Sequence, residues 1–307
     1  MTASVASKQK DTTKEHFPID DVIHFFGLGS VSHGVRSKIG RTNVTYFVVC
    51  SDGQEYAIRF MKYHNHDALR NEFFLHTILR EQGVKAAYML CSPDGNFLYK
   101  KDGVWATISR KIYGAHPRSP LSESEVFKVG QALSGLHCAL QGYSLPHKNK
   151  RSSVNYNVVQ ERVDGVKDKD LRAKINEIIR HTTILPSENL PSGILHGDLH
   201  VSNVLINNDE VAILDLENAA EGLLITDIGR SIADICGYPN GLNPIKVKKY
   251  IEGYEINRIL TEEEKECLYI AIAYRSAATS AWFINHSDFL NAQRFLSIAT
   301  KAIELMS

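Results

Sequence analysis

The sequence predicts an α+β protein in two parts, a small antiparallel β-sheet with one helix and a larger, mainly helical part. Three observations support this. Short runs rich in β-branched and aromatic residues dominate the first third of the 307 residues, a stretch containing Gly and Pro follows at Tyr113–Pro117, and helical patterns occupy most of the remainder. The hydrophobic content of 43% is enough for one or two buried cores.

Two hairpins are predicted in the first part. Each is a pair of β-rich runs around an Asp-Gly turn, a signal typical of antiparallel hairpins. The pairs are Val44–Val49 with Glu55–Met61 around Asp52-Gly53, and Phe97–Tyr99 with Trp105–Ile112 around Asp102-Gly103. Between the hairpins, apolar residues at helical spacing predict a helix from His66 to Gln82, which Gly83 ends.

The second part contains most of the predicted helices. Helical patterns lie at Glu123–Leu140, Lys167–His181, Asn243–Ile256, Thr261–Asn285 and Phe289–Met306. A short strand–loop–strand unit, Ile194–Leu216, interrupts them. We expect a first lobe at 19–112 and a second at 113–307, after a disordered leader at 1–18 that is polar and has no apolar core.

The composition argues against several classes of function. The 35 basic and 35 acidic residues give a formal net charge of zero, so no overall field attracts nucleic acid or an anionic membrane. No stretch approaches the roughly 20 apolar residues that span a bilayer. The five cysteines are scattered, which favours a reducing compartment and predicts a cytoplasmic protein. The oligomeric state does not follow from these properties.

The most informative segment is Ile194–Ile206, which contains Asp198 and Asn203 and is followed after a turn by Asp215. Phosphoryl transfer passes through a loose transition state, so its catalysis is mainly positioning and neutralisation of charge. It needs a carboxylate to accept the hydroxyl proton, which fits Asp198, and oxygen donors for Mg²⁺, which fit Asn203 and Asp215. Taken singly, Asp198 and Asn203 are better explained as turn caps, but their joint spacing with Asp215 between two apolar strands favours a catalytic site.

These segments resemble a known superfamily. The residues from His196 to Asn203 match the HxDxxxxN catalytic loop of protein kinases. His-Gly-Asp with a downstream Asp-Leu-Glu is similar to the aminoglycoside phosphotransferase, choline kinase and homoserine kinase superfamily. The resemblance implies a protein-kinase-like two-lobed fold that uses ATP and Mg²⁺ on a small-molecule hydroxyl. It also implies that Asp198 is the catalytic base, that Asn203 and Asp215 bind the metal, and that Glu217 is a second-metal candidate.

The resemblance further implies nucleotide-binding residues in the first part. Arg59, in Tyr56-Ala-Ile-Arg59, takes the place of the lysine in the Val-Ala-Ile-Lys strand of kinases, and Glu72 would be its ion-pair partner. A plain surface charge pair is the alternative. Gly40 and Asn43 resemble a phosphate-binding loop, although an ordinary hairpin turn fits equally well. The backbone of Ser109–Ile112 would pair with adenine.

Several later segments suggest roles around this site. Thr226–Arg230 resembles the aspartate segment that follows the metal motif, so we expect Asp227 to hold the catalytic loop by hydrogen bonds. Gly253-Tyr254 is one of several pieces that look like the homoserine kinases, which makes homoserine the first candidate acceptor. Under that hypothesis Arg275 meets the amino acid's carboxylate; the alternative is a helix-surface arginine with no ligand.

Three other functions stay open from the sequence. An aminoglycoside- or choline-type kinase would need an acidic pocket from residues such as Glu217, Glu221 and Asp288. A serine/threonine protein kinase would need an open cleft, whereas a metabolite kinase encloses its acceptor to exclude water. The non-enzymatic alternative is a pseudokinase that binds nucleotide without transfer, which the complete set of two aspartates and one asparagine argues against.

Overall fold

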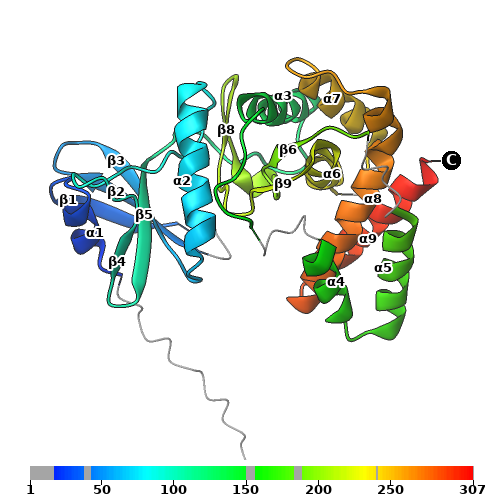
Figure 1. The fold of residues 1–307 in the computed structure, drawn as a ribbon, viewed down its shortest axis with the longest axis horizontal. Helices are drawn as coiled ribbons and strands as arrows, with labels where there is room; N and C mark the ends of the chain where they lie inside the picture. Colours follow the sequence, from blue (N-terminus) through cyan, green and yellow to red (C-terminus); the bar gives the residue numbers. More distant parts are fainter. Residues whose placement is uncertain (1–16, 38–42, 150–155, 183–188, 240, 307) are drawn as a thin grey trace, which may run out of the picture. The chain divides into compact units, whose positions relative to one another are not determined.

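The computed structural model describes residues 17–37, 43–149, 156–182, 189–239 and 241–306 (Figure 1). They form two compact units. Unit 1 runs to Tyr63 and includes Leu90–Ile108, whereas unit 2 consists of His64–Met89 and the chain from Ser109 onward. The lobe ranges 19–112 and 113–307 remain predictions, and residues 1–16 of the expected leader lie outside the described residues.

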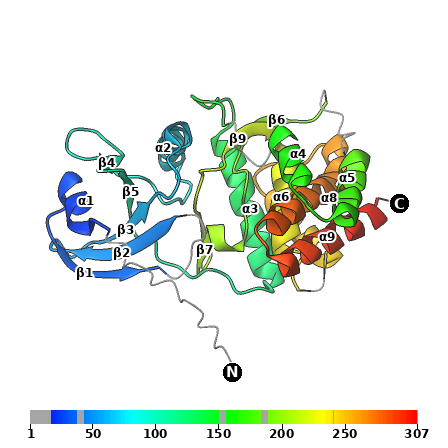
Figure 2. The same cartoon turned by 90° about the horizontal axis from the view of Figure 1, so that it is seen from below.

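Unit 1 is built on a five-stranded sheet with the strand order β1-β2-β3-β5-β4 (Figure 2). Its elements are α1 (Ile19–Phe25), β1 (Val31–Arg36), β2 (Val44–Cys50), β3 (Glu55–Phe60), β4 (Tyr99–Lys101) and β5 (Val104–Arg110). The pairs β1–β2, β2–β3 and β4–β5 are antiparallel. Both predicted hairpins are present, although β4 begins two residues later than expected.

The strand β3 shows why the sheet has a buried and an open face. Tyr56, Ile58 and Phe60 are buried, while Arg59 on the opposite face is half-buried. Successive side chains of β3 therefore alternate between the two faces of the sheet. The buried face joins the core of unit 1, and Phe17 at the end of the expected leader packs on it, with its ring centroid 4.7 Å from that of Phe60.

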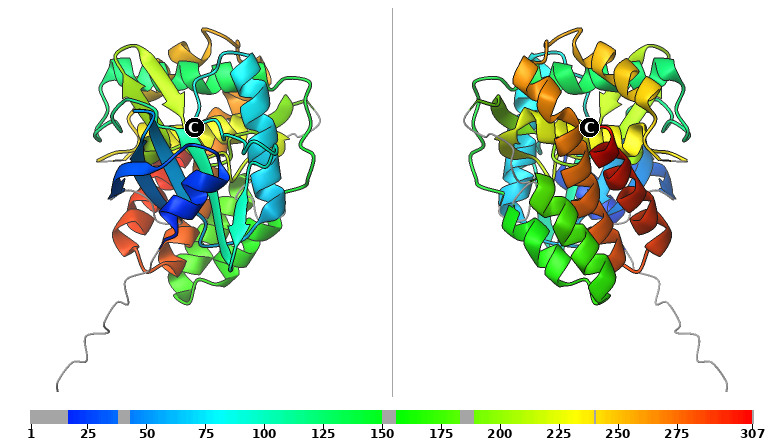
Figure 3. Two further views of the ribbon diagram at one scale, coloured as in Figure 1. Left: turned by 90° about the vertical axis from the view of Figure 1, so that its left-hand side faces the viewer. Right: turned by 90° about the vertical axis from the view of Figure 1, so that its right-hand side faces the viewer.

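Unit 2 is mainly helical, as predicted (Figure 3). Its helices are α2 (His66–Glu81), α3 (Glu123–Ala139), α4 (Tyr156–Asp164), α5 (Lys169–Thr182), α6 (Leu224–Ile235), α7 (Pro244–Tyr254), α8 (Glu262–Asn285) and α9 (Phe289–Glu304). The main packed pairs are α8 with α9, α3 with α7, and α6 with α8. In the described part of the chain, no helix is both long and apolar enough to cross a bilayer.

Two small antiparallel two-stranded sheets lie among these helices. They are β6 (Ser192–Leu195) with β9 (Ala220–Leu223), and β7 (Val204–Asn207) with β8 (Glu210–Ile213), and a 3₁₀ turn, η1 (Val201–Asn203), precedes β7. The predicted strand–loop–strand unit is present, but its second strand ends at Ile213 and does not reach Leu216. The Gly- and Pro-containing stretch Tyr113–Pro117 pairs with β7, because Ala115 and Ile206 exchange two backbone hydrogen bonds of 3.0 and 2.9 Å.

The helices α3 and α7 pack so closely that two glycines are required between them. A Cβ at Gly130 would lie 2.2 Å from the carbonyl oxygen of Tyr250, and one at Gly253 would lie 2.0 Å from that of Phe127. Any other residue at these positions would force the two helices apart. The glycines therefore fix the distance of α3 from α7.

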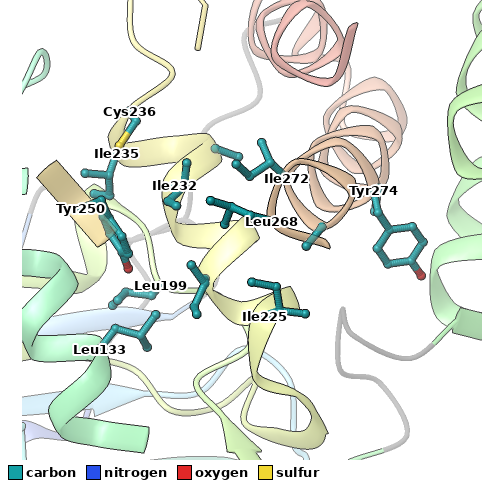
Figure 4. Close-up of a cluster of buried hydrophobic side chains, with 14 of the residues drawn as sticks. Leu133, Leu199, Ile225, Ile232, Ile235, Cys236, Tyr250, Leu268, Ile272 and Tyr274 are labelled. Carbon is teal, nitrogen blue, oxygen red and sulfur yellow. The ribbon is translucent and has the colours of Figure 1, made fainter. Parts of the chain in front are cut away.

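The main core of unit 2 reaches directly under the candidate catalytic loop (Figure 4). Leu199 is fully buried among Leu133 of α3 and Ile225 and Ile232 of α6. Because Leu199 follows Asp198 in the chain, burial of its side chain fixes the backbone that carries the aspartate.

Five elements were not predicted from the sequence: α1, β1, α4, α6 and β9. The helix α6 is buried at every position, although its apolar and polar residues do separate at helical spacing. From the sequence, this segment is interpreted only as the aspartate motif Thr226–Arg230 and not as a helix. The strand β1 is exposed over most of its length and reads as a polar loop. The helix α4 has nine residues and β9 has four, too few for a periodic pattern.

Candidate active site

The loop that begins at His196 is held by a buried aspartate of α6. The Asp227 carboxylate accepts hydrogen bonds from the backbone N–H of His196 at 2.7 Å and of Gly197 at 2.9 Å. Asp227 is fully buried, and these bonds confirm the role expected for it. Burial acts to raise the pKa of the Asp227 carboxyl, but its hydrogen bond with His137 and the surrounding charges outweigh burial and lower it.

Gly197 has a conformation that only glycine adopts readily. Its φ is +83°, and a Cβ would lie 2.2 Å from the carbonyl oxygen of Asn218. Its own carbonyl accepts a 2.8 Å hydrogen bond from Nη2 of Arg275. Arg275 is 2% exposed, so the expectation of a helix-surface arginine is wrong. A buried carbonyl oxygen needs a hydrogen-bond donor, and the guanidinium of Arg275 supplies one to the carbonyl of Gly197.

The Asp198 carboxylate is oriented by Arg230. Its Oδ1 accepts from Nε of Arg230 at 2.9 Å and lies 2.8 Å from Nη2. Burial alone would raise the pKa of the Asp198 carboxyl, but the charge of Arg230, aided by His200 and Arg275, holds it well below its usual range. The side chain stays 30% exposed, and its Oδ2 is 3.8 Å from Nε2 of His200, too far for a hydrogen bond. The carboxylate is therefore ionised, with one oxygen available.

One face of α6 holds the whole loop. Asp227, Arg230 and Asp234 are spaced by three and four residues, which places them on the same side of a helix. Asp227 bonds the start of the loop, Arg230 bonds Asp198, and Asp234 accepts from the backbone N–H of Val201 at 3.1 Å. Arg294 of α9 donates to Asp234 at 3.3 Å. Each turn of α6 thus makes one contact with the loop.

A chain of polar groups continues from Asp227 away from the loop. His137 Nε2 donates to Asp227 at 3.1 Å, and its Nδ1 accepts from the hydroxyl of Tyr254 at 2.7 Å. Arg258 donates to the same hydroxyl at 3.3 Å and to both carboxylate oxygens of buried Glu264. His137 is therefore a core residue with both ring nitrogens hydrogen-bonded, and this chain of polar groups ties α3, α7 and α8 to α6.

The candidate metal-binding residues are brought together through the backbone. The amide Nδ2 of Asn203 donates to the carbonyl of Asp198 at 3.0 Å, and the carbonyl of Asn203 accepts from the N–H of Leu214 at 2.9 Å. Leu214 precedes Asp215, which has a φ of +60°. Positive φ is uncommon for a residue other than glycine, and Asp tolerates it at sites that the surrounding structure fixes.

Glu72 lies in unit 2 and contacts this same segment. It is 1% exposed, and its carboxylate accepts from the backbone N–H of Leu216 at 3.3 Å. Leu216 follows Asp215 and Leu214 precedes it, so Glu72 and Asn203 bond the residues on either side of Asp215 in the chain. Arg59 belongs to unit 1, and its ion pair with Glu72 remains a prediction.

The other predicted nucleotide-binding residues are placed as follows. The Oδ1 of Asn43 accepts from the backbone N–H of Lys62 at 3.3 Å, next to β2. Gly40 lies outside the described residues. Ser109 forms an isolated antiparallel bridge with Met89, and Ile112 is half-buried. The binding roles of these residues remain predictions.

Two expected sources of an acidic pocket have structural roles. The Glu221 carboxylate accepts from the backbone N–H of Leu145 at 2.9 Å, and Asp288 is the N-cap of α9, where it accepts from Asn291. Among the described residues, no group of three or more His, Cys, Asp or Glu could hold a metal ion. Mg²⁺ needs fewer, because one or two protein ligands with substrate phosphates and water complete its shell.

The sequence did not identify Arg230, Asp234 or Arg294. The only signal was the spacing of Asp227, Arg230 and Asp234, which acquires meaning once 224–235 is known to be a helix. The partners of Arg230 and Asp234 lie 32 and 33 residues earlier in the chain, and no local pattern connects them.

The site agrees with a comparison to known families. Residues 35–258 match the model of the phosphotransferase enzyme family, APH. This chain belongs to that family. Two relatives of the APH phosphotransferase are named homoserine kinase. The one from Methylobacillus flagellatus is 25% identical over 75% of this chain and 72% of its own length, and the one from Agrobacterium fabrum is 30% identical over 62% and 60%.

Solved structures show the fold of the APH phosphotransferase. The amicoumacin kinase hAmiN, solved with AMP-PNP, Ca²⁺ and Ami, has a TM-score of 0.73 at 13% identity over 93% of this chain and 94% of its own. A microcompartment-associated aminopropanol kinase has a TM-score of 0.71 at 16% identity over 94% and 96%. The expected α+β, protein-kinase-like fold is therefore confirmed, and the chain is a phosphotransferase with an alcohol group as acceptor.

Proposed function

We propose that this phosphotransferase moves the γ-phosphoryl group of ATP, with Mg²⁺, to the hydroxyl of a small molecule, and that homoserine is the leading candidate. The observation that carries the proposal is the Asp198 carboxylate. It is ionised, oriented by Arg230, and joined through backbone bonds to Asn203 and to the segment that contains Asp215.

Asp198 is assigned to the acceptor hydroxyl. Its Oδ1 is occupied by Arg230, so Oδ2 receives the hydrogen bond of the acceptor. A carboxylate of low pKa is a weak base, which suits a loose transition state, because the hydroxyl keeps its proton until the new P–O bond is well advanced. The main contribution of Asp198 is then to orient the hydroxyl oxygen towards phosphorus.

The metal is assigned to Asn203 and Asp215, with Glu217 as a candidate for a second ion. The donor set fits Mg²⁺, because an amide oxygen and a carboxylate are hard ligands, and the Asn203 amide nitrogen is bonded to Asp198, which leaves its oxygen for a cation. Bound Mg²⁺ would neutralise charge on the phosphates. The backbone bonds of Asn203 to Asp198 and Leu214 would hold the metal-binding side chains in position around the ion.

The nucleotide is assigned to unit 1 and the segment that follows it. Arg59 on β3 would bind phosphate oxygens, Gly40 and Asn43 would belong to the phosphate loop, and Ser109–Ile112 would meet adenine. Arginine can hold phosphate oxygens in a bidentate manner, so the lysine of other kinases is replaced without loss of charge. Glu72 would support both Arg59 and the segment around Asp215.

Homoserine is preferred to a cationic acceptor for two reasons. The curated relatives reported above carry the name homoserine kinase. In addition, Glu221 and Asp288, which an aminoglycoside- or choline-type kinase could use to bind a cation, are each committed to a backbone N–H. The surroundings of Asp198 carry arginines, which disfavours a cationic group there.

The test is ATP consumption by the purified protein over homoserine, choline, ethanolamine, amino sugars, aminoglycosides and a generic protein substrate. We expect turnover with homoserine and with no protein substrate, and a loss of about 100-fold or more in kcat for Asp198→Asn. Nucleotide affinity of this variant should be close to that of the native protein.

Asp209→Asn is the matched control, since Asp209 is an exposed aspartate at the β7–β8 turn. It should retain full turnover. Activity that survives in Asp198→Asn would remove Asp198 from its role, and turnover confined to an aminoglycoside or choline would replace homoserine while leaving phosphotransfer intact.

A further inference from the structure

His200 lies two residues after Asp198 and is fixed in the same loop. It is the N-cap of η1, where its Nδ1 accepts from the backbone N–H of Ser202 at 3.2 Å. Its own carbonyl accepts from the backbone N–H of Asn203 at 2.8 Å. The imidazole ring and the backbone of His200 are therefore both held by bonds within the loop that carries the candidate catalytic aspartate.

The bond to Ser202 defines which ring nitrogen of His200 carries a proton. A nitrogen that accepts a hydrogen bond has no proton of its own, and the neutral imidazole has one nitrogen of each kind. With Nδ1 as the acceptor, Nε2 is the donor. The side chain is 25% exposed, and among the described residues its Nε2 has no hydrogen-bond partner. The loop therefore presents an N–H group for a molecule other than the chain itself.

This N–H group lies close to the available oxygen of Asp198. Nε2 of His200 is 3.8 Å from Oδ2 of Asp198, whereas Oδ1 is bonded by Arg230. The separation is too long for a direct hydrogen bond, but one oxygen atom can lie at about 2.8–3.0 Å from both atoms. Such an oxygen has to donate to the carboxylate and accept from the imidazole. A hydroxyl group does both, whereas a phosphoryl oxygen only accepts and is repelled by the carboxylate.

We infer that His200 is a second catalytic residue, whose Nε2–H donates a hydrogen bond to the acceptor hydroxyl oxygen while that hydroxyl donates to Asp198. A hydroxyl oxygen has two lone pairs, so one accepts from His200 and the other is left to attack phosphorus. The two hydrogen bonds stop rotation about the C–O bond and direct the attacking lone pair. The inference rests on the proposed function and holds for any hydroxyl acceptor.

The transfer step is balanced with His200 as a donor that keeps its proton. The acceptor oxygen forms its bond to the γ-phosphorus, the bond from that phosphorus to the ADP oxygen breaks, and ADP leaves with the bonding electrons. The hydroxyl proton passes late to Oδ2 of Asp198 and from there to solvent. A hydrogen bond from His200 makes the oxygen a weaker nucleophile, but a loose transition state depends little on the strength of the nucleophile, so orientation has the larger effect.

Two substitutions at His200 separate its bond to Ser202 from its bond to the acceptor. Asparagine is a good cap and can accept from the Ser202 N–H, but its short amide does not reach the place of Nε2. Glutamine brings an amide N–H to that place and gives up the cap. We expect kcat with homoserine, or with whichever compound the acceptor screen identifies, to fall roughly 10- to 100-fold in His200→Asn and to recover partly in His200→Gln. The KM for MgATP should not change in either variant.

His181→Asn is the matched control, because His181 is an exposed histidine in the last turn of α5. It should keep the native kcat. A native kcat in His200→Asn would overturn the inference. A loss in His200→Gln equal to or larger than that in His200→Asn would show that the cap matters and not the donor, which would also overturn it.

Nitrogen NMR of His200 tests the proton position without turnover. Couplings between ring protons and ring nitrogens in ¹⁵N-labelled protein distinguish a protonated Nε2 from a protonated Nδ1. At about pH 8, above the ordinary pKa of histidine, we expect the proton on Nε2 and a shift of that resonance when homoserine is added with ADP and Mg²⁺. A proton on Nδ1 would overturn the inference. Turnover that needs Asp198 but not His200 would overturn it and leave the proposed function intact, whereas no ATP consumption with any compound would overturn both.

Discussion

At the scale of single residues, the contact between Arg230 and Asp198 determines the protonation of the candidate catalytic carboxylate. Burial pushes the pKa of Asp198 upward and is the largest single effect, but Arg230, His200, Arg275 and His196 together lower the pKa by more than burial raises it. Arg230 is the largest of these four, and both its Nε and its Nη2 approach Oδ1. Arg230 therefore orients the carboxylate and makes the largest contribution to keeping it ionised.

Arg230→Gln should move the acid limb of activity to higher pH. Without the guanidinium, burial is opposed only by weaker neighbours, so the pKa of Asp198 rises and a smaller fraction is ionised at any acidic pH. A profile of kcat/KM against pH is the measurement. Arg294→Gln, which removes a partner of Asp234 and leaves Asp198 bonded, is the control and should show a smaller displacement; identical limbs in all three proteins would contradict this account.

Gly197→Ala should lower the free energy of unfolding by about 2 kcal/mol or more. A left-handed φ costs an alanine roughly 1 kcal/mol, and the contact of its Cβ with the Asn218 carbonyl at 2.2 Å adds to this cost. Gly142→Ala is a matched control, because Gly142 also has a φ of +83° and no heavy atom within 4 Å of an added Cβ. Urea unfolding measures both. Equal losses would show that the contact with Asn218 does not matter.

At the scale of elements, α6 is the support of the catalytic loop. It is buried on every side, and its one polar stripe reaches the loop at three points. The fully buried Asp227 makes the largest share of these bonds, to two backbone N–H groups and to His137. A change at this position should therefore affect stability and turnover together.

Asp227→Asn should reduce the free energy of unfolding at pH 7 by roughly 2–3 kcal/mol, the usual value of hydrogen bonds to a charged group. The pKa of Asp227 is lowered in the folded state, so the stabilisation is present above the unfolded pKa of about 4 and is lost as pH falls through the folded value. Urea unfolding between pH 7 and pH 3 should show a smaller acid-induced loss in the variant. Asp209→Asn, with an exposed carboxyl, should leave the curve nearly unchanged.

The elements found from the sequence are those with a strong local pattern. The hairpin around Asp52-Gly53 has a turn signal and β-rich strands, and α3 and α8 begin at capping boxes. The helix α6 was missed although its apolar residues lie at helical spacing, because its segment was interpreted only as the aspartate motif. Asp198, Asn203 and Asp215 were identified by spacing, whereas Arg230 was not, because its partner is distant in the sequence.

At the scale of the whole molecule, the grouping of α2 with unit 2 depends on contacts between segments far apart in the chain. Glu72 bonds the N–H of Leu216, and Asn71 exchanges two hydrogen bonds with the backbone of His147. The N–H of Ile213 donates to Lys85 just after the helix. The sequence predicts the helix from its own residues, but these partners lie 76 to 144 residues away, and no local preference encodes them.

Binding of MgATP should stabilise the whole folded chain. A ligand at 100 times its Kd raises the free energy of unfolding by about 2.7 kcal/mol, provided that it binds only the folded state. We expect thermal unfolding to shift upward with ATP and Mg²⁺, and the shift to shrink when EDTA removes the ion. In Asp215→Ala the shift should be small under both conditions. An ATP-induced shift that ignores EDTA in the native protein would count against the metal assignment.

The single polar stripe of α6 has a consequence for how the chain can change in length. One residue inserted between Asp227 and Asp234 would turn everything after it by about 100° around the helix axis, so at most one side of the stripe could still meet the loop. The number of residues between Asp227 and Asp234 is therefore fixed by the need for both side chains to bond the catalytic loop. The β7–β8 turn at Asp209 is open to solvent, and a longer turn there would alter its bonds with Lys128 without rotating the residues that hold the loop.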